Sequence, residues 1–181
     1  KEISAIPKQI ISQLPKNHKI LDVASGKLNN DNYKDFIISI KKTNEQIDEN
    51  GNYPNRILMI FVGTKTNIFK LSKINDKNAI LGLNFGSNRD DPFLGIKIEK
   101  ENFIIEHGVA SGSSHWKQYL KFQFNEDLDN WILKKDEMIS FSESFEEGLK
   151  WDEEYGMQIR SHKVKTEKNF GIITIDKFEI K

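Results

Sequence analysis

The chain has 181 residues, 27 basic and 27 acidic side chains and no cysteine, a composition that fits one domain with zero net charge and a sizeable core. Zero net charge argues against a partner bound through bulk electrostatics, such as duplex nucleic acid or an anionic membrane, and the absence of cysteine excludes disulfides and thiolate chemistry. No apolar run approaches the roughly 18 residues of a membrane-spanning helix.

The N-terminal region predicts a short helix followed by a β-hairpin. Residues 7–14 form the helix, because Pro7 suits a first helical position and Pro15 ends it. The hydrophobic period then changes to two, which predicts a strand at Lys19–Ala24 and its hairpin partner at Asp35–Lys41.

The remainder of the chain is predicted to be mostly strand. Ile57–Val62 is apolar on both faces and therefore belongs inside a sheet. Further strands are predicted at Asn67–Ser72, Gly95–Glu99, Asn102–His107, Lys117–Phe124, Trp131–Leu133, Met157–Val164 and Ile172–Ile180. Beyond the N-terminal segment, only Asp76–Leu81 and Ser144–Trp151 leave room for helix.

Many short strands separated by turns indicate an α+β fold that is predominantly antiparallel β. We expect a single mixed β domain over residues 1–181 with a short N-terminal helix. Within it, residues 1–41 hold the helix and the first hairpin, and residues 56–181 hold the main sheet.

The loop of the first hairpin carries a pattern of oxygen-bearing side chains. In Gly26–Asp35, the side chains of Asn29, Asp31 and Asp35 occupy positions three, five and nine of a calcium-type loop. Asn32 occupies position six, which requires a tight left-handed turn that Asn tolerates best after Gly. This spacing is typical of a loop that gathers oxygens around a hard cation.

The strand, the glycine and the Leu-Asn-x-Asp-x-x-x-Asp loop resemble the hairpin loop of FG-GAP or VCBS-type domains, in which such loops commonly bind calcium. The rest of the chain resembles a poorly characterised group of bacterial envelope and lipoprotein-like proteins in which one such hairpin opens a β-rich domain. The matching pieces are Arg56–Phe61, Asp91–Phe93, Phe103–His107, Trp116, Phe122–Phe124 and Asn169–Ile172. The resemblance implies a β-rich architecture and an extracytoplasmic location, in the periplasm, at the outer membrane or secreted. We expect a removed signal or lipoprotein leader before Lys1, since the first residue is not Met; a trimmed or disordered N-terminus stays open as the alternative.

Position one of the loop departs from the calcium pattern, because it holds Lys27 where such sites place Asp. A fixed ammonium group beside the ion site disfavours calcium. We therefore predict a metal-free loop in which Lys27 replaces the cation and pairs with Asp31 and Asp35. An ordinary Asx-rich turn with no ion stays open as the alternative.

Residues 106–116 are the one segment that invites an enzymatic interpretation, since His107 and His115 flank a Gly/Ser loop. A hydrolase needs a serine activated by a histidine that a carboxylate orients. The segment lacks the Gly-x-Ser-x-Gly spacing, and in a strand Glu106 points to the opposite face from His107. We interpret it as a loop with histidines at strand ends and assign no catalytic or metal-binding residue.

The turn before Phe93 carries adjacent carboxylates at Asp90 and Asp91. Adjacent side chains in a turn usually diverge, so this pair is not placed for acid–base work. We expect a structural role, with Arg89 held by one of the two carboxylates or lying on the surface.

The stretch 143–155 interleaves aromatic side chains with acidic ones, a pattern typical of protein-docking surfaces. The predicted contact residues are Phe145, Glu146, Trp151, Asp152 and Tyr155. The alternative is a solvated acidic loop whose aromatic side chains fold back onto the core.

The sequence as a whole predicts a non-enzymatic extracytoplasmic domain that binds another protein and needs no cofactor. A more specific possibility is an inhibitor or immunity-type protein. A ligand- or glycan-binding module and a small hydrolase using residues 106–116 stay open as alternatives. Nucleic acid is not expected, because the basic residues are scattered among acidic ones.

Overall fold

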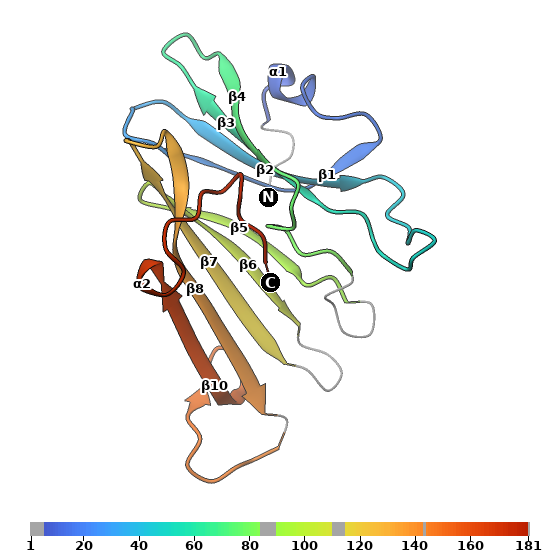
Figure 1. Cartoon of the computed structure of the whole chain (residues 1–181), viewed down its shortest axis with the longest axis vertical. Helices are drawn as coiled ribbons and strands as arrows, with labels where there is room; N and C mark the ends of the chain where they lie inside the picture. Colours follow the sequence, from blue (N-terminus) through green and yellow to red (C-terminus); the bar gives the residue numbers. More distant parts are fainter. Residues whose placement is uncertain (1–5, 84–89, 110–114, 143, 181) are drawn as a thin grey trace.

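The computed structural model describes residues 6–83, 90–109, 115–142 and 144–180. These residues form two antiparallel sheets and two short helices (Figure 1). The predicted class, mostly antiparallel β with little helix, is confirmed.

The first sheet is a meander with strand order β1-β2-β3-β4. Its strands are β1 (His18–Gly26), β2 (Asp35–Lys42), β3 (Ile57–Gly63) and β4 (Phe69–Asn75). β1 and β2 pair as the predicted hairpin, and β3 pairs with both β2 and β4, as its two apolar faces predict. The boundary drawn at residue 56 does not separate the sheets, since β3 and β4 lie in the same sheet as the N-terminal hairpin.

The second sheet has the strand order β5-β6-β7-β8-β10-β9. Its strands are β5 (Phe93–Glu99), β6 (Asn102–Val109), β7 (Trp116–Asn125), β8 (Asn130–Ser142), β9 (Trp151–Asp152) and β10 (Met157–Thr166). β5 and β6 are joined by Lys100 and Glu101, which both adopt positive φ, as in the turns that match the twist of a hairpin.

One hydrophobic core joins the two sheets, because side chains from both sheets pack in the same cluster. Ile37 and Ile60 of the first sheet meet Phe103, Phe122 and Trp131 of the second. The other face of the first sheet is covered by the N-terminal segment, whose helix α1 (Lys8–Ile11) buries Ile10 completely. Since β2 has neighbours on both faces, six consecutive residues from Asp35 are buried.

The helix predictions need correction. α1 spans four residues instead of eight, and Ile11 is 42% exposed. Asp76–Leu81 contains no helix, because the side-chain oxygen of Asn75 accepts the backbone N–H groups of Lys77 and Ala79 and fixes a turn there. The described residues of 144–151 also contain no helix.

The C-terminal segment differs from the predicted strand at Ile172–Ile180. A second helix, α2 (Glu167–Phe170), precedes it, capped by Thr166 and Asn169. The following residues make only an isolated bridge, Ile132 to Thr174, before a turn in which Phe178 N–H donates to Ile175 O. This turn breaks the alternation that a strand requires.

The distal parts of β8 and β10 extend past the first sheet and form an arm, residues 135–166. In Figure 1 the arm reaches the lower end of the longest axis, and the loop between β8 and β10 lies at its end. Residues 144–158, at that end, are called the tip below. The second sheet thus carries the tip away from the shared core.

Candidate functional site

The loop of the first hairpin is held together by a buried carboxylate. Asp35 is completely buried, and its two oxygens accept the backbone N–H groups of Leu28 (2.8 Å) and Gly63 (2.9 Å). Burial raises the pKa of the Asp35 carboxyl, and these backbone hydrogen bonds partly oppose that shift. A side chain at Gly63 would collide with the carbonyl oxygen of Lys34, so this close approach requires glycine.

The contacts of Lys27 differ from the prediction. Its amine donates to Asn32 Oδ1 at 2.8 Å, while Asp31 accepts the side-chain amide of Asn29 and the backbone N–H of Tyr33. Lys27 therefore does not serve as the counter-ion of Asp31 and Asp35, because backbone and amide donors already satisfy these two carboxylates. Asn32 is also not among the described residues with positive φ, so the predicted left-handed turn is wrong.

The same loop is fastened to the second sheet. The Leu28 side chain lies in the shared core, and the indole of Trp131 donates to Leu28 O at 2.8 Å. Asn30 is hydrogen-bonded to Glu126 in the turn between β7 and β8. These contacts give the loop a role in joining the sheets. Across the described ranges, no group of three His, Asp or Glu side chains is placed to hold a metal ion.

A buried arginine organises a second polar cluster. Arg56 lies just before β3 with a fully buried side chain, between Glu45 (2.7 Å) and Asp91 (2.6 Å), and it also donates to Leu81 O. Hydrogen bonds and charge interactions with Arg56 outweigh burial and lower the pKa of both carboxyls. Asp91 therefore has a structural role as predicted, with Arg56 as its partner; Arg89 lies outside the described residues.

His107 is completely buried in β6, beside this cluster. Its Nε2 accepts the backbone N–H of Leu81 at 3.2 Å, while Nδ1 has no hydrogen-bond partner. Burial lowers its pKa to about 3, and the Arg56 charge adds to the shift. Glu106 and His107 lie on opposite faces of the strand, as predicted. The partner of Glu106 is Lys97. Residues 110–114 of the proposed hydrolase loop lie outside the described residues.

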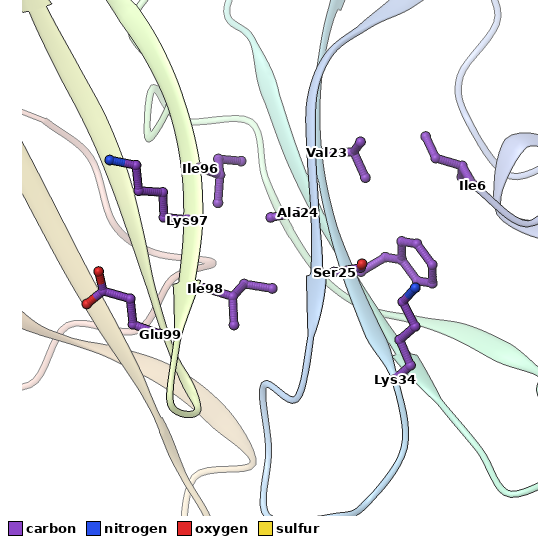
Figure 2. Close-up of a pocket in the computed structure, with 10 residues that line it drawn as sticks. Ile6, Val23, Ala24, Ser25, Lys34, Ile96, Lys97, Ile98 and Glu99 are labelled. Carbon is purple, nitrogen blue, oxygen red and sulfur yellow. The ribbon is translucent and has the colours of Figure 1, made fainter. Parts of the chain in front are cut away.

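A hollow of about 610 Å³ lies where the edge strands β1 and β5 approach each other. Figure 2 shows Ile96 and Ile98 pointing from β5 towards Ala24 of β1. The two edges are already joined, because Ile96 N–H donates to Asp22 at 2.8 Å. The Asp22 carboxylate thus satisfies an N–H group on the free edge of β5, which disfavours pairing of that edge with another chain.

The tip of the arm exposes two large aromatic side chains. Phe145 is 83% exposed and Trp151 is 59% exposed, and both line a hollow of about 380 Å³. Met157 and Gln158, at the start of β10, line it as well. Exposed aromatic side chains that gather around one hollow mark an interaction site more clearly than scattered apolar residues do.

Local hydrogen bonds anchor the backbone of the tip. The buried amide of Gln158 accepts the backbone N–H of Glu146 (2.7 Å) and donates to the carbonyls of Glu146 (3.0 Å) and Leu149 (3.3 Å). The Glu146 carboxylate accepts the Ser142 hydroxyl and contacts Arg160, and these two contacts lower its pKa. The loop therefore has a defined conformation that presents Phe145 to solvent.

Tyr155 behaves differently from the other two aromatic residues of the tip. Its ring stacks on Phe141 with centroids 4.3 Å apart, and the Lys117 amine lies 4.5 Å from the ring centroid. Asp152 accepts the backbone N–H of Tyr155 at 2.8 Å and so stabilises the turn. The predicted contact residues thus divide into exposed aromatics, Phe145 and Trp151, and supporting residues, Glu146, Asp152 and Tyr155.

Sequence reasoning missed several residues of this site. The sequence predicts a strand at Met157–Val164 and gives no sign that Met157, Gln158 or Ser142 belongs to a binding site. These residues line the hollow because β9 pairs with Met157 and Gln158. This pairing cannot be predicted from the local sequence.

No protein-family model matches this chain, and no curated protein is significantly similar to it. None of the helices in the described part is long and apolar enough to cross a membrane.

Proposed function

We propose that this chain is a protein-binding domain whose contact surface is the tip of the arm. The observation that carries the proposal is the pair of exposed aromatic side chains, Phe145 and Trp151, on the rim of one hollow. Aromatic side chains beside a pocket are the usual anchors of interfaces, where a few residues supply most of the binding energy.

The energetics favour a partner that covers both rings. Fully burying an exposed large apolar side chain contributes about 1.5–3 kcal/mol, so leaving both rings in water forgoes a few kcal/mol. The hydrogen bonds of Gln158 hold the loop in place before binding, which reduces the conformational entropy lost on association.

The charge around the hollow favours a basic partner. Glu147 and Glu153 are exposed at the tip next to Asp152, while Glu154 pairs with Lys117 and Lys150 adds one positive charge, so the segment keeps a negative balance. An acidic rim steers a basic partner towards the surface and disfavours acidic ones. We expect a basic surface segment that inserts one apolar side chain between Phe145 and Trp151.

The proposal includes a location outside the cytoplasm and, in its specific form, an inhibitor or immunity-type role in which the tip occupies a toxin or a hydrolase. The resemblance of the first hairpin to FG-GAP-type loops supports the location. The projecting tip supports the role, because a loop at the end of an arm can enter the cleft of another protein.

Site-specific photocrosslinking in cells tests the proposal. Benzoylphenylalanine replaces Phe145 in one variant and Ile172 in the control; Ile172 is 69% exposed and follows α2, away from the tip. A defined crosslinked protein at position 145 but not at 172 supports the tip as the contact surface. Identical crosslinking patterns at both positions contradict it.

The specific form is tested on the crosslinked partner. If that partner is an enzyme, an equimolar amount of this chain abolishes its activity, and Trp151→Ala restores it. An enzyme that stays fully active in the complex contradicts the inhibitor role and leaves the binding role standing.

The exposed ring of Trp151 also favours a second candidate, a glycan-binding module, because sugar rings pack on exposed aromatic side chains. Titration with cell-wall oligosaccharides, followed by NMR of the Trp151 indole, distinguishes the two candidates. Saturable shifts of that indole support glycan binding, and unchanged spectra favour a protein partner.

A further inference from the structure

In Figure 1 the C-terminal segment crosses the second sheet beside α2. A third hollow, of about 350 Å³, is lined by residues of both. Its apolar lining comes from β8, α2 and the C-terminal segment: Leu133, Phe170, Ile173, Phe178 and Ile180. The volume is that of a small-molecule site. This hollow is separate from the tip and does not depend on the function proposed for the tip.

The apolar wall is formed in advance by backbone hydrogen bonds. Leu133 N–H donates to Ile173 O at 2.9 Å, and Ile175 N–H donates to Trp131 O at 2.8 Å. The Asn75 side chain of the first sheet donates to the carbonyls of Ile175 (2.6 Å) and Phe178 (2.7 Å). The C-terminal segment is therefore held in place over the sheet, so a ligand need not order it.

Polar groups of both charges converge on the same hollow. Gln118 is only 5% exposed, and its amide nitrogen donates to Asp136 Oδ1 at 2.8 Å, which leaves the amide oxygen as an acceptor. Lys165 of β10 is the cross-strand partner of Asp136 of β8, and Glu179 of the C-terminal segment also lines the hollow. Neither Lys165 nor Glu179 forms an ion pair with any residue in the described ranges.

One ligand chemistry satisfies all these groups. A carboxylate fits the amine of Lys165, an ammonium group fits Asp136, Glu179 and the Gln118 oxygen, and an apolar body fits the wall. We propose that this hollow binds a free α-amino acid with a large apolar side chain. The opposed charges orient the backbone of the amino acid, and the apolar wall selects its side chain.

Titration of the whole chain with L-phenylalanine, followed by two-dimensional NMR, tests the proposal. We expect saturable shifts of the Gln118 side-chain amide and of backbone amides around Lys165 and Ile173. L-Glutamate serves as the matched ligand control, because it keeps both backbone charges and lacks the apolar body. Shifts that never saturate, or that gather elsewhere on the chain, overturn the proposal.

Charge variants then test the orientation. Lys165→Gln, at an exposed position, is expected to weaken L-phenylalanine binding at least about tenfold without loss of fold, since surface substitutions change stability little. Phenylpropionate, which lacks the ammonium group, is expected to bind more weakly than L-phenylalanine; equal binding overturns the amino-acid class. Trp151→Ala is expected to leave this titration unchanged, which separates it from the test of the tip.

Discussion

Two polar loops of this chain have similar compositions, but one is packed into the core and the other is exposed to solvent. The loop 26–35 between β1 and β2 and the tip between β8 and β10 are both rich in acidic or amide side chains. In the first, Leu28 and Asp35 are completely buried, and Trp131 of the other sheet holds the loop. In the second, Phe145 and Trp151 face solvent.

The difference lies in where the carboxylates find their donors. Asp35 accepts the backbone N–H groups of Leu28 in the loop and of Gly63 at the end of β3, so this carboxylate ties the loop to the first sheet. Among the described residues, the Glu146 and Asp152 side chains accept hydrogen bonds from groups within or next to the tip, so these two carboxylates shape the tip without attaching it to the core. The tip is attached to β6 and β7 through Tyr155 and Glu154, which bond to Val109 and Lys117, and Phe145 and Trp151 remain free for a partner.

The largest expected effect separates the two carboxylates. Asp35→Ala leaves the buried N–H groups of Leu28 and Gly63 without acceptors, at about 1–3 kcal/mol each, so we expect a loss of about 3 kcal/mol or more. Urea unfolding measures it. Glu146→Ala is the matched control at the tip, with an expected change below about 0.5 kcal/mol. Equal losses in the two variants would contradict the comparison.

The next effect concerns the buried histidine of the core. The pKa of His107 is lowered from 6.5 to about 3 in the folded chain. Between these two pH values the imidazole is protonated in the unfolded chain and neutral in the folded chain. Stability conferred by the neutral imidazole is therefore lost as pH falls, by about 2 kcal/mol between pH 7.5 and pH 5.

The control for this pH effect is His107→Gln, because glutamine does not titrate and the histidine contribution to the pH dependence of the unfolding free energy is then absent. The charged groups facing His107 are Arg56 and Asp91, and they are common to both proteins. The difference in slope also cancels the titration of Asp35, whose raised pKa acts in the opposite direction. Parallel slopes from pH 7.5 to pH 5 would show that His107 is accessible to solvent.

A smaller effect is expected for the exposed aromatics themselves. Phe145→Ala and Trp151→Ala remove side chains that already contact water, so unfolding free energies should change by less than about 0.5 kcal/mol each. Thermal and urea unfolding check this. A loss of several kcal/mol would mean that these rings support the fold.

The smallest effect is expected from calcium. Asp31 and Asp35 already accept protein donors, so the melting temperature in excess EDTA should equal that in millimolar calcium. A well-occupied site would add about 2.7 kcal/mol at a hundredfold excess over its dissociation constant. A clear rise in melting temperature would make loop 26–35 a binding site and reverse the comparison.

Local pattern was enough to predict most of the fold. The strand predicted at Asp35–Lys41 is β2, and the interior position of Ile57–Val62 followed from its two apolar faces. The errors arise where distant contacts decide. The C-terminal segment reads as strand locally, but Asn75 of the first sheet binds its carbonyls and favours the turn.

The candidate site was predictable in part for the same reason. An acidic run with aromatic residues marked the segment, but Tyr155 alone stacks on Phe141 of β8. The direction of each ring depends on strand pairing outside the segment. The partner of Lys27 likewise depended on backbone donors, such as Gly63, that lie far from the loop in sequence.

The affinity of the tip for its crosslinked partner tests the central claim most directly. Calorimetry compares the native chain with the double variant Phe145→Ala/Trp151→Ala and with Ile172→Ala as the control. We predict a loss of at least about a hundredfold in the double variant and unchanged affinity in the control. Native affinity in a folded double variant would contradict the account, because the exposed aromatics would then contribute nothing to binding.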